Sequence, residues 1–109
     1  MRKRSFALLL AIVLLLTACA QAVSYEQITQ EEAKQIMDTT NGYILLDTRT
    51  REEYDQSHIP GALLIPHTEI ARRADEELPD KDQLILVYCR SGNRSKQASE
   101  VLAELGYTN

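Results

Sequence analysis

A cysteine with arginines close behind it is the segment of the chain best suited to chemistry. The segment reads Cys89-Arg90-Ser91-Gly92-Asn93-Arg94. Neighbouring cations favour the thiolate form of a cysteine, and the thiolate rather than the thiol is the nucleophile. We therefore expect Cys89 to be reactive and to hold an anion at its sulfur. The alternative is an inert cysteine buried at the end of a strand, which is common in proteins.

A strand and a helix are expected to position this loop. Residues 84–88 form a continuous apolar run that predicts a buried strand, and helical spacing begins at Ser95. Gly92 and Asn93 tolerate the left-handed backbone that a sharp turn needs. In such a turn, successive backbone N–H groups point inward and form an anion nest, and the helix start adds further N–H groups. The loop is therefore predicted to stabilise a negatively charged sulfur on Cys89.

Strands and helices alternate along the rest of the chain. The other predicted strands cover residues 25–28, 43–46 and 62–65. Helices are predicted from the capping box of Thr29 and Glu32 to about Asp38, from the capping box of Thr50 and Glu53 through Tyr54, from Thr68 onward, and from Ser95 to Gly106. This alternation indicates an α/β fold with a mostly parallel sheet. Ligands bind at the carboxyl ends of such strands, where Asp47 and Cys89 both lie.

Apolar residues at helical spacing mark the helix faces that we expect to pack on the sheet. These residues are Ala33, Ile36 and Met37, then Ile70, Ala71, Ala74 and Leu78, and finally Ala98, Val101, Leu102 and Leu105. Tyr54 and Tyr88 are expected to belong to the core rather than to a site. The segment from His58 to Gly61 is predicted to form a turn.

The first residues of the chain predict export. A basic head precedes an apolar run at residues 6–16, and Leu16-Thr17-Ala18-Cys19 follows. The run is too short for a comfortable membrane span of about 20 residues, so it indicates a secretory signal. The last four residues resemble the lipobox of bacterial lipoproteins. That resemblance implies removal of residues 1–18, lipidation of Cys19 and a tether over residues 19–24.

A signal anchor that is not cleaved is the alternative to the lipoprotein. In both cases the basic head stays inside, so the domain at residues 25–109 is expected on the extracytoplasmic side of a bacterial membrane. With lipidated Cys19 on the tether, Cys89 would be a free thiol rather than half of a disulfide.

Charge and histidine content exclude several classes of function. The chain has 12 basic and 16 acidic residues, and removal of residues 1–18 leaves 9 and 16, a net charge of −7. An acidic domain is poorly suited to nucleic acid or anionic lipid. His58 and His67 lack a third ligand at useful spacing, so no metal site is expected. We expect no cofactor and a monomer.

Two groups of residues resemble the motifs of rhodanese domains. The first is Asp47-Thr48-Arg49, Glu53-Tyr54, His58-Ile59-Pro60-Gly61-Ala62 and Ile65-Pro66, and the second runs from Cys89 to Ser95. The resemblance covers about residues 25–109. It implies a rhodanese-like open sheet, mostly parallel, with helices on both faces. It also implies a sulfurtransferase that moves sulfur from thiosulfate or a persulfide to cyanide or a thiol, through a persulfide on Cys89.

The same resemblance implies roles for individual residues. Backbone N–H groups of Arg90, Ser91, Gly92, Asn93 and Arg94 would bind the persulfide, and the arginines would attract the donor. Asp47 and Arg49 would brace the site, supported by Ser95. Related phosphatases have a loop that is one residue longer, so this loop favours sulfur transfer over phosphate hydrolysis.

The end of the chain departs from the family pattern. Family members usually continue through one more strand towards a tryptophan, whereas this chain ends at Asn109 and contains no tryptophan. We therefore expect the last strand to be missing, with marginal stability or an aggregation-prone edge. Two alternatives to the sulfurtransferase are a catalytically silent, membrane-tethered binding module and a cysteine-dependent phosphatase or arsenate reductase.

Overall fold

A parallel sheet lies at the centre of the structure, a computed structural model that describes residues 25–109. The elements are α2 (Gln30–Thr39), β1 (Ile44–Asp47), α3 (Arg51–Gln56), β2 (Leu63–Leu64), the 3₁₀ turn η1 (His67–Glu69), α4 (Ile70–Glu77), β3 (Ile85–Tyr88) and α5 (Asn93–Glu104). Within residues 25–109 the strand order is β2-β1-β3, and both pairs are parallel. The predicted α/β fold is confirmed. The predicted signal peptide, the tether and Cys19 lie outside the described residues.

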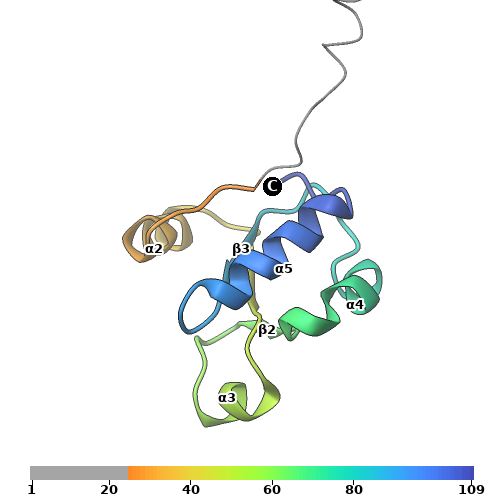
Figure 1. Ribbon diagram of the computed structural model, residues 1–109. Coiled ribbons are helices and arrows are strands. Elements are labelled where there is room, and N and C mark those ends of the chain that lie inside the picture. Colours follow the sequence, from red (N-terminus) through yellow and green to blue (C-terminus); the bar gives the residue numbers. More distant parts are fainter. Residues whose placement is uncertain (1–24) are drawn as a thin grey trace, which may run out of the picture.

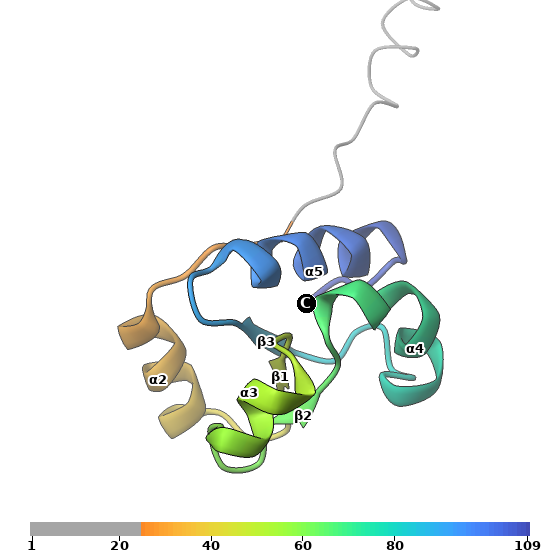
Figure 2. The ribbon, with the colours of Figure 1, turned by 60° about the horizontal axis from the view of Figure 1, so that its bottom comes forward.

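Helices cover both faces of the sheet, as predicted (Figures 1 and 2). Successive strand residues point to opposite faces, so Leu45 and Leu46 of β1 enter different cores. Leu46 belongs to the core beneath α4 and α5, together with Ile65, Ile70, Ala74, Leu78, Ala98, Leu102 and Tyr107. Leu45 packs on the other side with Ala62 and Leu86, against partly buried Ile36 and Met37 of α2. Because α2 has no buried residue, this second face is the less completely covered one.

Local capping sets the starts of two helices. The side chains of Thr29 and Thr50 accept hydrogen bonds from the backbone N–H groups of Glu32 and Glu53, and each glutamate reaches back to the capping residue. Both predicted capping boxes are therefore confirmed. The predicted strands at residues 43–46, 62–65 and 84–88 are confirmed within one or two residues at each end.

Two predictions about packing are wrong. Residues 25–29 form neither strand nor helix. A strand needs a neighbour for its backbone bonds, and the outer edge of β3 is instead approached by the last residue, because Ile85 N donates to Asn109 O at 3.2 Å. Ala71 is exposed. Helix α4 buries Ile70 and Ala74 one turn apart, which turns Ala71 away from the sheet.

The helix after Cys89 begins earlier than predicted. Helix α5 starts at Asn93 rather than Ser95, and its N-cap is Gly92 with φ 86°. Asn93 is helical, and no residue other than glycine has a positive φ among the described residues, so of the two residues that tolerate a left-handed backbone only Gly92 adopts it. One left-handed glycine suffices to turn the chain from β3 into α5. Arg94 and Ser95 consequently lie in the first turn of the helix.

No helix within residues 25–109 is long and apolar enough to cross a membrane.

Candidate active site

Cys89 lies directly after β3, at the edge of the sheet where β1 also ends. The register pairs Asp47, the last residue of β1, with Tyr88, the last residue of β3. The two predicted strand-end residues, Asp47 and Cys89, are therefore brought to the same edge. Cys89 is a partly buried free thiol.

The loop after Cys89 folds back over its sulfur. The backbone N–H of Gly92 donates to the Cys89 Sγ at 3.0 Å. The Ser95 Oγ lies 3.4 Å from the same sulfur and also reaches the Gly92 carbonyl oxygen at 3.0 Å. The positive φ of Gly92 aims its N–H inward, and the first turn of α5 brings Ser95 next to the sulfur.

These contacts favour the thiolate. Burial alone would raise the pKa of Cys89, but the hydrogen bond between its sulfur and the Ser95 hydroxyl and those with the backbone of Ser95, Ser91 and Gly92 lower it below its usual value of 9.0. The positive end of the α5 dipole acts in the same direction. A thiolate at this position is a nucleophile whose added charge the loop can hold.

The two arginines of the loop have different surroundings. Arg94 forms a bidentate ion pair with Glu53 of α3, at 2.6 and 2.9 Å. The Arg94 guanidinium lowers the pKa of Glu53 from 4.5 to about 2, assisted by hydrogen bonds from Thr50. Arg90 is exposed and lines a pocket above Cys89. Arg94 thus joins α5 to α3, whereas Arg90 faces the opening.

Asp47 is completely buried beside the site and collects hydrogen bonds from two side chains. Its carboxylate accepts from Arg49 Nε at 3.0 Å, from Arg49 Nη2 at 2.8 Å and from the Tyr88 hydroxyl at 2.9 Å. Burial would raise the pKa of Asp47, but the hydrogen bonds from Arg49 and then Tyr88 outweigh it and lower the pKa. Asp47 is therefore an anion whose charge depends on Arg49.

The same network holds the segment at residues 57–60. Arg49 Nη2 donates to the Ser57 carbonyl oxygen at 2.7 Å, and Ile59 N–H donates to the Tyr88 hydroxyl at 3.3 Å. His58, between them, stacks on Tyr54 with ring centroids 3.6 Å apart. The predicted turn is present, because Ala62 N–H donates to the Ile59 carbonyl oxygen.

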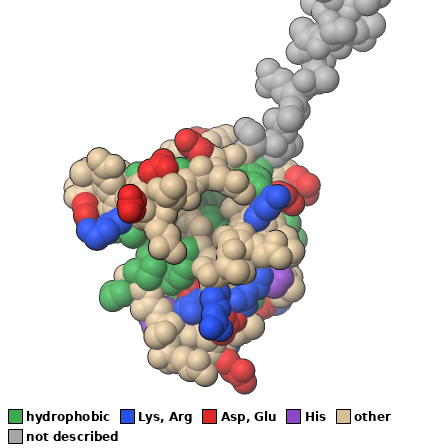
Figure 3. Space-filling model, turned by 60° about the vertical axis from the view of Figure 1, so that its left-hand side comes forward, with side chains coloured by type: hydrophobic (Ala, Val, Ile, Leu, Met, Phe, Trp, Pro, Cys, Tyr) green, Lys and Arg blue, Asp and Glu red, His purple; other side chains and the backbone are tan. Residues whose placement is uncertain are grey.

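A pocket of about 420 Å³ opens over Cys89. It is lined by Arg49, Ser57, His58, Ile59, Pro60, Tyr88, Cys89 and Arg90. On one face of the molecule, Lys and Arg side chains gather beside a hydrophobic patch (Figure 3). The pocket combines cations, a nucleophile and an apolar wall, which suits a small anion.

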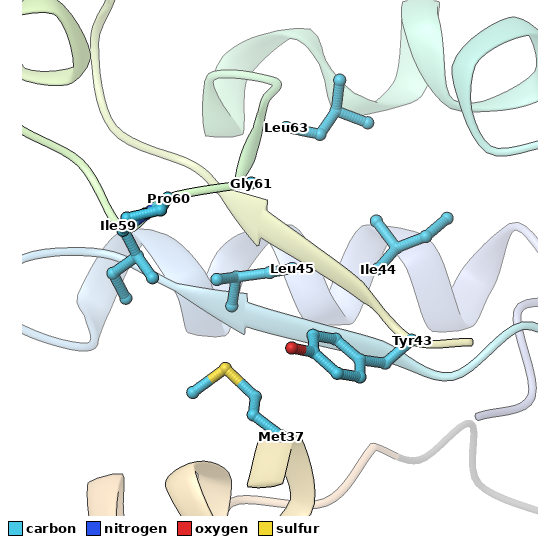
Figure 4. A pocket seen from close by; sticks show the side chains of 8 residues that line it. All are labelled: Met37, Tyr43, Ile44, Leu45, Ile59, Pro60, Gly61 and Leu63. Carbon is cyan, nitrogen blue, oxygen red and sulfur yellow. The ribbon is translucent and has the colours of Figure 1, made fainter. Parts of the chain in front are cut away.

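A second pocket, of about 470 Å³, lies on the α2 side of β1. Met37, Tyr43 and Leu45 border it (Figure 4), and Ile59 and Pro60 line both pockets. The wall at these two residues therefore separates the Cys89 pocket from an apolar space that carries no nucleophile.

Two residues of the site had other interpretations in the sequence. The sequence predicts Glu53 as a helix cap and as part of the rhodanese-like motif, without a partner, and it predicts Tyr88 as core, against which Tyr88 does pack. A buried tyrosine hydroxyl needs a polar partner, and that requirement was the signal available for Tyr88. For Glu53, nothing local indicates a partner 41 residues away. The structure describes no cluster of three or more His, Cys, Asp or Glu residues that could hold a metal ion within residues 25–109.

Comparison with known proteins gives a consistent family. A family model described as "Rhodanese-like domain" matches residues 29–109. The chain is 44% identical to thiosulfate sulfurtransferase PspE of Escherichia coli, over 59% of this chain and 62% of that protein. It is 40% identical to a sulfurtransferase of Allochromatium vinosum, over 74% of each chain. A solved structure described as "rhodanese with anions from E. coli" is 42% identical with a TM-score of 0.59, covering 62% of this chain and 79% of that one.

Proposed function

The chain belongs to the rhodanese-like domain family, whose relatives are named sulfurtransferases, and from this membership we propose that it transfers sulfane sulfur through a persulfide on Cys89. One observation carries the proposal: the Gly92 N–H, at the head of α5, donates directly to the Cys89 sulfur at 3.0 Å. A donor at that position stabilises a thiolate, and the nest of N–H groups to which it belongs is suited to the terminal anion of a persulfide.

The reaction has two displacement steps. The Cys89 thiolate attacks the outer sulfur of thiosulfate, the S–S bond of thiosulfate breaks, and sulfite leaves with the bonding electrons. The enzyme then carries a Cys89 persulfide anion. Cyanide attacks the terminal sulfur, leaves as thiocyanate and restores the thiolate. A thiolate acceptor would take the sulfur in the same way and become a persulfide.

The geometry supports different roles for the arginines. Arg90 is exposed at the pocket and has no side-chain hydrogen bond within the described residues, so it is suited to attract an anionic donor. Arg94 is held by Glu53, so we assign it to fixing the first turn of α5 rather than to contacting the donor directly. The solved relative described as "rhodanese with anions from E. coli" supports the proposal that the substrate of this chain is an anion.

We also propose that the domain is exported and lipid-anchored through Cys19. The basic head, the short apolar run and the lipobox-like residues before Cys19 support this localisation. Metabolic labelling of bacterial cells with a palmitate analogue tests it. Label should enter the wild-type chain and be absent from Cys19→Ser; equal label in both chains would refute the anchor.

Intact-mass measurement after incubation with thiosulfate tests the chemistry. The 109-residue chain is used with Cys19→Ser, so that Cys89 is the only thiol. We expect the mass of the protein to increase by one sulfur atom, which cyanide then removes. The variant that carries Cys89→Ser in addition to Cys19→Ser should show no increase. A folded protein that gains no sulfur from thiosulfate or from glutathione persulfide is not a sulfurtransferase, and a binding role would replace the proposal.

A further inference from the structure

One wall of the Cys89 pocket is a segment with no helix or strand of its own. Residues 57–59 form neither, yet His58, Ile59 and Pro60 all line the pocket. Two hydrogen bonds hold the backbone of this segment. Arg49 donates to the Ser57 carbonyl oxygen, and the Ile59 N–H donates to the Tyr88 hydroxyl. Its position over Cys89 therefore depends on groups that emerge from the ends of β1 and β3.

The Tyr88 hydroxyl is suited to hold this segment because it donates one hydrogen bond and accepts another. Its proton goes to the Asp47 carboxylate at 2.9 Å, which leaves an oxygen lone pair to accept from Ile59 N–H at 3.3 Å. Burial raises the pKa of Tyr88, and the bond to Asp47 does so too, so the hydroxyl keeps its proton. Tyr88 directly precedes Cys89, so the nucleophile and one support of the opposing wall lie on neighbouring residues at the end of β3.

We propose that Tyr88 is a positioning residue whose hydroxyl fixes the Ile59–Pro60 wall and thereby limits the size of the sulfur donor that reaches Cys89. This inference rests on the proposed sulfur transfer and deepens it. Ile59 is 41% exposed, so its side chain alone cannot hold the wall in place. The apolar space of about 470 Å³ behind Ile59 and Pro60 gives the wall room to move when the hydroxyl is lost.

Tyr88→Phe removes this hydroxyl and keeps the ring. The test uses the full chain with Cys19→Ser and measures kcat/KM for thiosulfate and for the bulkier benzenethiosulfonate, which leaves as benzenesulfinate. We expect the ratio of benzenethiosulfonate to thiosulfate to rise about fivefold, the factor that one ordinary hydrogen bond supplies. The change should come mainly from KM, because the Gly92 and Ser95 contacts to the sulfur are untouched.

Tyr107→Phe is the matched control. Its hydroxyl is also buried and donates to carbonyl oxygens of Ala74 and Leu78, in the core under α4 and α5. It should lower the stability without changing the donor ratio. If the role of Tyr88 is purely structural, Tyr88→Phe should also lower the stability and leave the donor ratio unchanged. That result would overturn the inference.

Alkylation of Cys89 separates this inference from the proposed function. Iodoacetamide and the larger N-phenyl iodoacetamide react with a thiolate whether or not the protein transfers sulfur. Tyr88→Phe should raise the relative rate of the larger reagent. If the parent forms no persulfide but this ratio still rises, the wall role stands and sulfur transfer fails. If the alkylation ratio stays constant, the wall role fails.

Amide hydrogen exchange in the parent needs no variant. The Ile59 N–H should exchange more slowly than the N–H of exposed His58, which donates no backbone hydrogen bond within the described residues. Equal exchange of the two amides would show that the Tyr88 hydroxyl does not hold the wall, even where Tyr88→Phe fails to fold.

Discussion

Arg49→Met tests whether the buried charge of Asp47 depends on one partner. The Asp47 side chain is 0% exposed and that of Arg49 is 14% exposed. Removing one partner of a buried ion pair leaves an uncompensated charge and costs about 3–5 kcal/mol. We expect about 3 kcal/mol, the lower end of that range, because Arg49 reaches the surface and the Tyr88 hydroxyl still donates to Asp47. For a domain of this size, that is a large share of the unfolding free energy.

Urea unfolding at neutral pH measures this loss, with two further variants. Asp47→Asn combined with Arg49→Met replaces the carboxylate by an amide and should recover part of the stability. Arg72→Met is the matched control, because Arg72 is 72% exposed and pairs with Glu69 on the surface. An exposed pair contributes about 0–1 kcal/mol, so the control should change little. Equal losses in Arg49→Met and Arg72→Met would refute the dependence of Asp47 on Arg49.

The pH dependence adds a second check on the same pair. The pKa of Asp47 in the folded protein lies below its ordinary value of 3.8. The stability that Asp47 contributes is therefore fully present above that value and is lost as the pH falls through the lowered pKa. The difference in unfolding free energy between the parent and Arg49→Met should accordingly shrink below pH 3.8. A difference that grows on acidification would contradict the sign of the shift.

Three further predictions concern the loop. Ser95→Ala should raise the pKa of Cys89, because the contact with the Ser95 hydroxyl lowers that pKa, and the pH midpoint of iodoacetamide alkylation should move upward. Ser95→Thr should largely keep the midpoint of the parent, and an unchanged midpoint in Ser95→Ala would exclude this role of Ser95. The parent should lose stability as the pH falls from 4.5 to about 2, because the pKa of Glu53 is lowered from the first value to the second, and Glu53→Gln should not show this loss. The same pH dependence of the unfolding free energy in both proteins would contradict a stabilising pair between Glu53 and Arg94. Arg90→Gln should raise KM for thiosulfate several-fold at low salt and less at high salt. Lys96 lies outside the pocket lining, so Lys96→Gln should leave KM unchanged. Equal increases of KM in the two variants would show that only the net charge of the protein matters.

Local patterns in the sequence predicted the framework of the site. The apolar runs ending near Asp47 and at Cys89 placed both residues at the carboxyl edge of one sheet, and the register confirms it. The capping boxes at Thr29 and Thr50 are likewise formed by residues three apart. These features follow from short-range periodicity, so a single sequence contains them.

Features that depend on distant partners were not predictable in the same way. The strand expected at residues 25–28 is absent, because its existence depends on a neighbour and not on its own composition. The start of α5 at Asn93 was missed by two residues, since Gly92 alone makes the turn. The partner of Arg94 is 41 residues away, and no local pattern indicates it.

The early start of α5 explains why two arginines in one loop have different surroundings. Arg94 falls in the first turn of the helix, where the positive end of the dipole disfavours a cation. Glu53 offsets this, and its own place in the first turn of α3 is favourable for an anion. The Arg94 charge is therefore largely neutralised by its partner. The backbone N–H groups at the start of α5 donate to the Cys89 sulfur, and Arg94 interacts electrostatically with Cys89 while it is paired with Glu53. Under the proposed mechanism, the fixed N–H groups would hold the persulfide anion, and the exposed Arg90 at the pocket would meet the sulfite as it leaves.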